Sequence, residues 1–338
     1  MDISIIVINY KSTKLILDCI ESIYEHTTKN SFEIILVDND SKDDCQEKVT
    51  AKYPATRWLQ MGYNAGFGRA NNAGFKIANG EFILLLNADT IITACAIDKC
   101  VALLKKHDEA IGCGVQLLNP DGSNQISGAY NIKGGLNSLL PLPYTGSIIR
   151  SLGYLSKSTI PSIKEFSDAT EIDWIVGAFI MVKKKLLKKS GYFDEDFFMY
   201  AEEIEWCNRL RKNGKLLLFA EPKVIHLLGG TSNDYYDTTE NENGRNVWNA
   251  KGQQIIISNM LRIRKQLGLH WLFVNAFFYL ANVPVFFVCL LVDKIINGKK
   301  AQFSWANFGG YLQNMQTLLR FLPRMIINKP WFYKVALT

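Results

Sequence analysis

The chain has 338 residues, enough for two domains of ordinary size. Hydrophobic residues make up 48% of it and charged residues 21%, which excludes the disordered, collagen-like and low-complexity classes. The seven cysteines are odd in number and form no C-x-x-C pair, so we expect a reduced, cytosolic compartment rather than a disulfide framework or a zinc cluster. The start, Met1-Asp2-Ile3, lacks a basic segment, so no secretory signal is predicted.

The net charge of +6 comes from the C-terminal quarter. Residues 262–338 hold ten of the 38 lysines and arginines but one of the 32 acids, Asp293. The rest of the chain is therefore slightly acidic. The same quarter is rich in Trp, Phe and Leu, and a basic, apolar segment is typical of binding to a membrane surface. Nucleic acid is not expected as a partner.

The N-terminal part predicts alternating strands and helices. Apolar runs at residues 3–8 and 33–38 indicate buried strands, and apolar residues at helical spacing over 14–24 predict a helix between them. Strands joined by such a crossover are parallel. The pattern continues with a helix over 68–78, a strand over 81–86 and a helix over 95–106. The chain therefore opens as an α/β sheet of the nucleotide-binding type.

The middle of the chain is less regular. Residues 119–170 are rich in Gly, Pro and Ser, and we expect a long loop-rich excursion beside the site. Residues 229–246 are polar and predict a loop, and the chain is expected to be helical from about 247. The elements predicted between them are a strand over 172–182, a helix over 201–213 and short strands over 215–219 and 223–225.

Polar residues directly follow the predicted strands. Asn9-Tyr10, Asp38-Asn39-Asp40-Ser41 and Asn87-Ala88-Asp89 stand at carboxyl ends, where open α/β sheets bind ligands. A single Asp after a strand is commonly a turn residue, but three such ends together predict a site.

The glycine-containing run from Asn64 to Gly74 narrows the class of ligand. No P-loop motif occurs, and Asn71 stands where a dinucleotide fingerprint needs Gly, which disfavours a dehydrogenase. Gly66 and Gly68 precede a predicted helix, whose N-terminus favours a phosphate or sugar close to the backbone. The alternative is a simple turn and helix cap.

An ordered set of segments resembles the family 2 inverting glycosyltransferases with a GT-A fold, and within them the bacterial rhamnosyltransferase-like branch. The set begins with residues 4–10, 37–41 (VDNDS), 64–68 (NAGFG) and 86–90 (LNADT). It continues with residues 174–178 (WIVGA), 191–195 (GYFDE), 198–207 (FMYAEEIEWC) and His226, and so spans about residues 1–230. The resemblance implies transfer of a sugar, with inversion, from a nucleoside diphosphate to a hydroxyl group.

The resemblance implies a fold and a domain organisation. We expect a GT-A type α/β fold, with a mixed, mostly parallel central sheet, over residues 1–246. Its parts are a nucleotide-sugar-binding half over 1–118, the excursion over 119–170 and an acceptor and catalytic-base half over 171–246. A basic, hydrophobic helical region that associates with a membrane or dimerises is expected over 247–338.

The resemblance also implies a divalent metal, Mg²⁺ or Mn²⁺. The family's Asp-x-Asp motif is here Asn87-Ala88-Asp89, so Asp89 is a predicted metal ligand and Asn87 is expected to contact ribose or phosphate. His226 is the second predicted ligand, and phosphate oxygens and water would complete an octahedral shell. The structural alternatives are a helix cap for Asp89 and a buried structural role for His226.

Further donor contacts are predicted at the strand ends. Asp38 would accept a hydrogen bond from a pyrimidine N–H, which suits a dTDP- or UDP-linked donor. Asn9 and Tyr10 would line the same pocket. Asn64, Gly66 and Asn71 would approach the sugar or the phosphates.

Inversion needs a base that takes the proton of the attacking hydroxyl. In place of the family's Glu-Asp pair stands Glu202-Glu203, and we assign Glu203 as the base and Glu202 as a positioning residue or acceptor contact. A solvated helix face is the alternative for this acidic run. The floor where the donor meets the acceptor is predicted at Trp174, Gly177 and Ala178, for which a buried strand is the alternative.

Residues 271–292 are uncharged and long enough to span a bilayer. Basic residues flank them on both sides, which favours a helix, or a hairpin broken at Pro284, that lies in one leaflet. We therefore expect a peripheral or monotopic enzyme on the cytoplasmic side of the cell membrane. A homodimer interface and a transmembrane span are the alternatives.

The best prediction is rhamnose transfer from dTDP-rhamnose to a polyprenyl-diphosphate-linked glycan, in the synthesis of a bacterial surface polysaccharide such as O-antigen. Other donor sugars, such as UDP-hexoses, stay open. The competing hypotheses are a sugar-nucleotide nucleotidyltransferase and a catalytically silent, membrane-associated scaffold. The segment Asn9-Tyr10-Lys11-Ser12 lacks the glycines that a nucleotidyltransferase needs.

Overall fold

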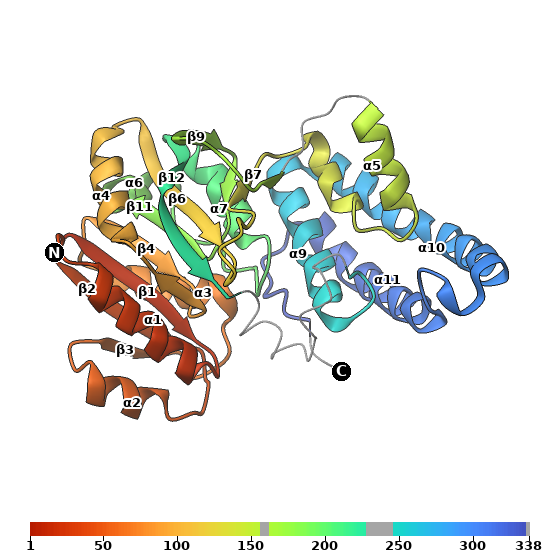
Figure 1. Cartoon of the computed structure of the whole chain (residues 1–338). Coiled ribbons are helices and arrows are strands. Elements are labelled where there is room, and N and C mark those ends of the chain that lie inside the picture. The colour runs from red at the N-terminus through yellow and green to blue at the C-terminus, as the bar shows by residue number, and fades with distance from the viewer. Residues whose placement is uncertain (156–161, 228–245, 336–338) are drawn as a thin grey trace. The chain divides into compact units, whose positions relative to one another are not determined.

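The computed structural model describes residues 1–155, 162–227 and 246–335 (Figure 1). The contacts within the chain divide it into two compact units. The first unit comprises residues 1–130, 161–198 and 202–235. The second unit comprises residues 131–160, 199–201 and 236–338.

The first unit begins with four parallel strands in the order β3-β2-β1-β4. These are β1 (Ile3–Asn9), β2 (Phe32–Asp38), β3 (Arg57–Gln60) and β4 (Phe82–Leu86). The helices between and after them are α1 (Thr13–His26), α2 (Cys45–Lys52), α3 (Gly66–Ile77) and α4 (Ala96–Lys106). The predicted βαβ unit and its parallel strands are confirmed.

The remaining strands make the sheet mixed. β11 (Phe179–Lys183) is antiparallel to β4 and to β6 (Ala110–Leu118), and β12 (Lys215–His226) is parallel to β6. β5 (Thr90–Ile92) and β9 (Ala169–Ile172) pair antiparallel with β12, which gives nine strands among the described residues. A second sheet joins β7 (Gly128–Ala129), β8 (Ser162–Ile163) and β10 (Trp174–Ile175). The helices α6 (Lys184–Ser190) and α7 (Glu202–Leu210) complete the unit.

The central strands are buried on both faces, as their continuous apolar runs predict. In β1, Ile5 and Val7 pack into one hydrophobic cluster with α1 and α4, whereas Ile6 packs into a second cluster with α3 and α7. This alternation follows from the two-residue period of a strand. Helices therefore cover both faces of the sheet and leave its carboxyl edge to the loops (Figure 1).

Three predicted strands differ from the structure. The strand expected over 172–182 is divided between β9, β10 and β11, because the chain leaves the main sheet at Asp173 and returns at Phe179. The two short strands expected over 215–225 are one strand, β12, with a shift in its pairing between Phe219 and Lys223.

The second unit is helical. The segment expected as a loop-rich excursion contains the 3-10 helix η1 (Lys133–Leu139) and α5 (Thr145–Leu155), and residues 131–160 belong to this unit by their contacts. The C-terminal part forms α9 (Ala250–Leu267), α10 (Leu269–Asn297), η2 (Gly298–Lys300) and α11 (Trp305–Ile326). The loop predicted over 229–246 lies almost entirely outside the described residues.

α10 is one continuous helix of 29 residues, so the predicted hairpin broken at Pro284 is wrong. An interior proline removes one helical hydrogen bond but is tolerated where neighbouring helices support the turn. α9, α11 and η1 pack against α10 along its length (Figure 1). By length and composition α10 is able to cross a membrane.

A buried carboxylate ties the amino ends of the strands together. The side chain of Glu33 on β2 accepts hydrogen bonds from Ser4 Oγ (2.6 Å), Arg57 Nη1 (2.7 Å) and the backbone N–H of Asn79 (2.7 Å). Burial acts to raise the pKa of the Glu33 carboxyl, but these hydrogen bonds outweigh it and hold the pKa below its ordinary value. The ionised form therefore stabilises the folded state.

We expect Glu33→Gln to lower the free energy of unfolding by about 1–3 kcal/mol at pH 7. Because the folded-state pKa is depressed, the contribution is complete above the unfolded value of about 4.3 and disappears as the pH falls through the folded value. Urea unfolding at pH 7 and pH 3.5 measures this difference, with the exposed Glu81→Gln as control. An equal destabilisation at both pH values would contradict the role of the charge.

Candidate active site

The parallel register of β1 and β2 places Asn9 beside Asp38 at the carboxyl edge of the sheet. Asn9 Nδ2 donates to Asp38 Oδ1 at 2.8 Å. Asp38 Oδ2 accepts from Gln60 Nε2 at 2.7 Å and from the backbone N–H of Ser41 at 3.1 Å. Asn9 and Asp38 are buried, so within the chain they fix the loops that follow β1 and β2. Their predicted contact with a nucleobase is not tested by this geometry and stays a prediction.

Tyr10 and Asn39 follow these two residues in the chain. Tyr10 is partly exposed, and Lys11 Nζ lies 5.5 Å from the centre of its ring. Asn39 is buried and holds the next loop: its Oδ1 accepts from the N–H of Ala65 at 2.7 Å, and its Nδ2 donates to Asn64 Oδ1 at 3.2 Å. Sequence reasoning assigned Asn39 no role, although it stands inside the motif that contains Asp38.

Gly66 allows a close approach between two segments of the first unit. Its φ is +74°, and a Cβ there would lie 1.9 Å from the backbone oxygen of Phe198, so only glycine fits. The neighbouring N–H of Phe67 donates to the same oxygen at 3.0 Å. Asn71 is buried within α3, where its Nδ2 donates to Phe67 O at 3.0 Å. The start of α3 is thus fixed next to the segment that leads towards α7.

The strand pairing brings Asp89 and His226 together. β5 and β12 pair Thr90 with His226, and the N–H of Leu227 donates to Asp89 O at 2.9 Å. Both side chains are buried, and Asp89 Oδ1 lies 3.4 Å from His226 Nε2. Asn87, which is partly exposed, holds the same turn, since its backbone oxygen accepts from Thr90 Oγ1 at 2.7 Å.

The buried side chain of Gln125 fixes the orientation of His226. Gln125 Nε2 donates to His226 O at 2.6 Å and to Leu118 O at 3.1 Å, and both partners are carbonyl groups that accept only. Gln125 Oε1 therefore faces His226 Nδ1, at 3.1 Å, and accepts a hydrogen bond from the Nδ1–H group. In the neutral ring this leaves the Nε2 lone pair directed at Asp89. Sequence reasoning missed Gln125, because its partner is 101 residues away.

The residues present fit a divalent cation. Asp89 Oδ1 and the Nε2 of a neutral His226 are two candidate cation ligands 3.4 Å apart, whereas a protonated His226 would form an ion pair with Asp89. Oxygen and nitrogen donors suit Mn²⁺ or Mg²⁺. Among the described residues no group of three or more His, Cys, Asp or Glu side chains is arranged for a metal. Asp89 and His226 would therefore hold the ion together with donors from a bound ligand and water.

α7 supplies two neighbouring acids in different surroundings. Glu202 is buried, and its Oε2 has no hydrogen-bond partner within the described residues. Burial first, and the charge of Glu203 second, raise the pKa of Glu202 well above its ordinary value. Glu203 is only partly buried and lies beside Gly177, where a methyl group added to the glycine would lie 4.0 Å from Glu203 Cγ. Burial therefore disfavours the ionised form of Glu202 relative to a free carboxyl.

The remaining predicted acceptor residues lie next to these groups. The backbone oxygen of Ala178 accepts from the N–H of Asn87 at 3.0 Å, which joins the segment before β11 to the turn that carries Asp89. Trp174 is partly exposed, and its indole Nε1 is buried without a partner in the described part of the chain. An acceptor contact by these residues stays a prediction.

Glu205 and Arg209 stand four residues apart on α7 and form an ion pair, with Nη2 2.7 Å from Oε2. Arg209 also donates to the backbone oxygens of Ser190 (2.6 Å) and Tyr192 (2.7 Å). The pair therefore holds the loop after α6 onto α7, and its role is structural.

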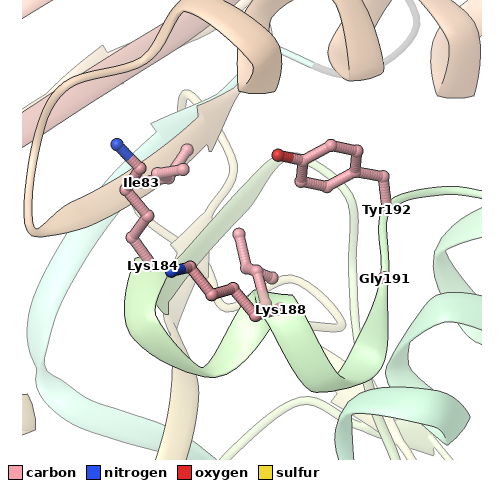
Figure 2. Close-up of a pocket in the computed structure, with 6 residues that line it drawn as sticks. Ile83, Lys184, Lys188, Gly191 and Tyr192 are labelled. Carbon is pink, nitrogen blue, oxygen red and sulfur yellow. The ribbon is translucent and has the colours of Figure 1, made fainter.

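A small pocket lies elsewhere in the first unit (Figure 2). Its two lysines, Lys184 and Lys188, come from α6, and Tyr192 points its ring over the same space. Lys184 Nζ already donates to Ala78 O at 2.7 Å, and the Tyr192 ring stacks on Phe75 with 5.0 Å between the ring centres. None of the predicted site residues lines this pocket, so we do not assign it to the site.

Comparisons with known proteins place the chain in a family. A family model described as Glycosyl transferase family 2 matches residues 4–191. The low-salt glycan biosynthesis hexosyltransferase Agl10 of Haloferax volcanii is 28% identical over 215 residues, which cover 62% of this chain and 62% of that protein. The N-acetylglucosaminyl-diphospho-decaprenol L-rhamnosyltransferase of Mycobacterium tuberculosis is 26% identical over 215 residues, which cover 59% of this chain and 67% of that protein.

The fold is similar to that of a solved glycosyltransferase. The mannosyltransferase PcManGT of Pyrobaculum calidifontis, in complex with GDP-Man and Mn²⁺, superposes with a TM-score of 0.54 at 14% identity. The match covers 97% of this chain and 87% of that chain. This likeness confirms the GT-A fold expected from the sequence.

We expect Gln125→Leu to weaken Mn²⁺ binding about 10- to 100-fold, because the His226 ring loses the acceptor that fixes its tautomer. Calorimetric titration of Mn²⁺ into protein saturated with UDP or dTDP measures the affinity. Ser123→Ala, an exposed change on the same hairpin, is the control. Unchanged Mn²⁺ affinity in Gln125→Leu would refute the positioning role.

Proposed function

The chain belongs to glycosyl transferase family 2, and we propose that it transfers L-rhamnose, with inversion, from dTDP-rhamnose to a hydroxyl group of a lipid-linked glycan. The product would serve the synthesis of a surface polysaccharide. The similarity to a relative named as a rhamnosyltransferase supports the choice of sugar. The pairing of Asp89 with His226 beside the strand ends is the observation that carries the proposal.

The donor would bind along the carboxyl edge of the sheet. The loops after β1 and β2, held by Asn9 and Asp38, would receive the nucleobase and ribose, with Tyr10 at their exposed side. Asn64 and the start of α3, at Gly66, would face the sugar and the diphosphate, since N-terminal N–H groups of a helix favour an anion.

Departure of the nucleoside diphosphate leaves negative charge on the phosphate oxygens. A Mg²⁺ or Mn²⁺ ion held by Asp89 and His226 would supply the positive charge that stabilises this leaving group. Gln125 keeps His226 in the tautomer that such an ion requires. The amide of Asn87 would contact ribose or phosphate without adding negative charge.

Glu203 would act as the base. The acceptor hydroxyl attacks the anomeric carbon of the donor sugar, and a carboxylate nearby takes its proton as the bond forms. Glu203 is partly exposed and lies beside Gly177, so an acceptor would reach its carboxylate from this side. Glu202 is buried, away from an approaching acceptor, so we assign it a positioning role.

The acceptor would be a glycan on a polyprenyl diphosphate at the cytoplasmic side of the cell membrane. Two features support this location: the relative whose name includes diphospho-decaprenol, and the long apolar helix α10. The second unit would then hold the enzyme at the membrane that contains its substrate.

We expect dTDP to bind about tenfold more tightly than UDP and GDP, and each nucleotide to bind at least tenfold more tightly with Mn²⁺ than without it. Isothermal calorimetry with the three nucleotides, with and without Mn²⁺, measures these affinities. A preference for UDP would refute dTDP-rhamnose as donor. Binding that is independent of the metal would refute the roles of Asp89 and His226.

We expect Glu203→Gln to lower kcat about 10²- to 10⁴-fold while the affinity for dTDP stays within about twofold. Glu202→Gln is the matched comparison: it removes the neighbouring buried carboxyl without changing the size of the side chain, and a positioning role predicts a smaller loss of kcat than in Glu203→Gln. Sugar transfer is followed by release of dTDP. A larger loss in Glu202→Gln than in Glu203→Gln would reverse the assignment of the base.

A further inference from the structure

The long helix α10 has two opposite faces. Its buried residues lie on one side of the helix at 100° per residue, and they are Leu272, Asn275, Ala276, Tyr279, Asn282, Phe286 and Leu290. The other half of the circumference is apolar and exposed, with Phe273, Phe277, Phe278, Val285, Phe287, Val288, Leu291, Val292, Ile295 and Ile296 each 41–75% accessible to solvent. We call this second set the α10 face.

The polarity of α10 is reversed relative to a surface helix in water, which exposes polar residues and buries apolar ones. Asn275 donates through Nδ2 to Gly134 O at 3.0 Å and accepts from Ser138 Oγ at 2.7 Å. Thr145 Oγ1 donates to Asn282 Oδ1, and Tyr279 OH donates to Ser138 O at 2.7 Å. Asn275, Tyr279 and Asn282 Oδ1 thus have partners inside the second unit, whereas Asn282 Nδ2 is buried without one among the described residues. Between Phe273 and Val292 the exposed residues of the helix are all apolar.

The charges around the α10 face are almost all positive. Lys294, Lys299 and Lys300 lie at or just after the C-terminal end of the helix, and the last two are exposed. Asp293 is the one acid after residue 261, and its carboxylate accepts hydrogen bonds from Tyr144 OH (2.7 Å), Asn297 Nδ2 (2.7 Å) and the N–H of Gln302 (2.8 Å). An apolar surface with a basic end complements a lipid leaflet with anionic head groups.

We propose that the α10 face inserts into one leaflet of an anionic membrane, with the helix in the plane of the bilayer. α9, α11 and η1 pack on the opposite side of α10, so the helix is lipid-accessible on one side only, which fits immersion better than a crossing. Trp305 extends the surface, with its ring centre 5.8 Å from that of Phe287. The biological reason for this membrane binding rests on the proposed function, because a lipid-linked acceptor would lie in the same leaflet.

Flotation of the full chain with vesicles tests the proposal. We expect the protein to bind phosphatidylcholine vesicles that contain phosphatidylglycerol, and to bind several-fold more weakly without the anionic lipid or at high salt. The double variant Phe277→Gln/Val288→Gln should bind the vesicles about tenfold more weakly, or more weakly still. No binding by the unchanged protein, or full binding by this variant, would overturn the proposal.

The matched control is Ile148→Gln/Leu152→Gln on α5. Ile148 and Leu152 are 58% and 60% exposed, close to Phe277 at 65% and Val288 at 56%. α5 begins at Thr145, which contacts Asn282 on the buried side of α10, so this variant should keep full vesicle binding. Equal losses in the two double variants would refute the assignment to α10.

A C-terminal epitope tag distinguishes immersion from crossing. If α10 lies in one leaflet, the tag stays on the outside of the vesicle and protease removes it, whereas a protected tag would overturn the in-plane arrangement. Nucleotide binding, measured on the same samples, separates this inference from the proposed function. If the unchanged protein binds nucleotide but no vesicles, the membrane face alone is refuted. If it binds vesicles but none of the nucleotides, the proposed donor alone is refuted.

Discussion

The arrangement of the site depends on a buried hydrogen-bond chain at the carboxyl edge of the parallel strands. Asn9 donates to Asp38, Asp38 accepts from Gln60, and the next residue, Asn39, holds the loop before α3. Three strands and three loops are thereby fixed relative to one another. The amides and the carboxylate find full partners within the fold, so the edge keeps its shape without a ligand.

Much of the first unit was predictable from local patterns. The buried strands have continuous apolar runs, and polar residues that follow parallel strands must meet at one edge, so the neighbourhood of Asn9, Asp38 and Asn87 follows from sequence. The approach of His226 to Asp89 came only through the resemblance. Gln125 gave no signal, because a residue that orients another through hydrogen bonds across 101 positions has no local pattern.

The packing of the second unit could not be predicted from sequence patterns. Composition indicates that residues 271–292 are apolar, but it does not indicate which side of the helix packs against the rest of the unit. The deciding contacts come from residues 133–145. Their glycines and serines predict a loop, but they supply carbonyl and hydroxyl groups that bind Asn275, Tyr279 and the Oδ1 atom of Asn282. Composition predicted a loop there, whereas the structure has the 3-10 helix η1 over Lys133–Leu139, and composition gave no indication of its packing.

The reversed polarity of α10 also changes which substitutions the protein tolerates. In most helices, inward positions accept only apolar residues and outward positions accept almost anything. Here the inward Asn275 and Asn282 hold specific hydrogen bonds, so leucine at either position would leave buried partners unsatisfied. Outward positions would accept exchange among Phe, Val, Ile and Leu and exclude charge. Sequence variation among close relatives should therefore be chemically restricted on both sides of this helix.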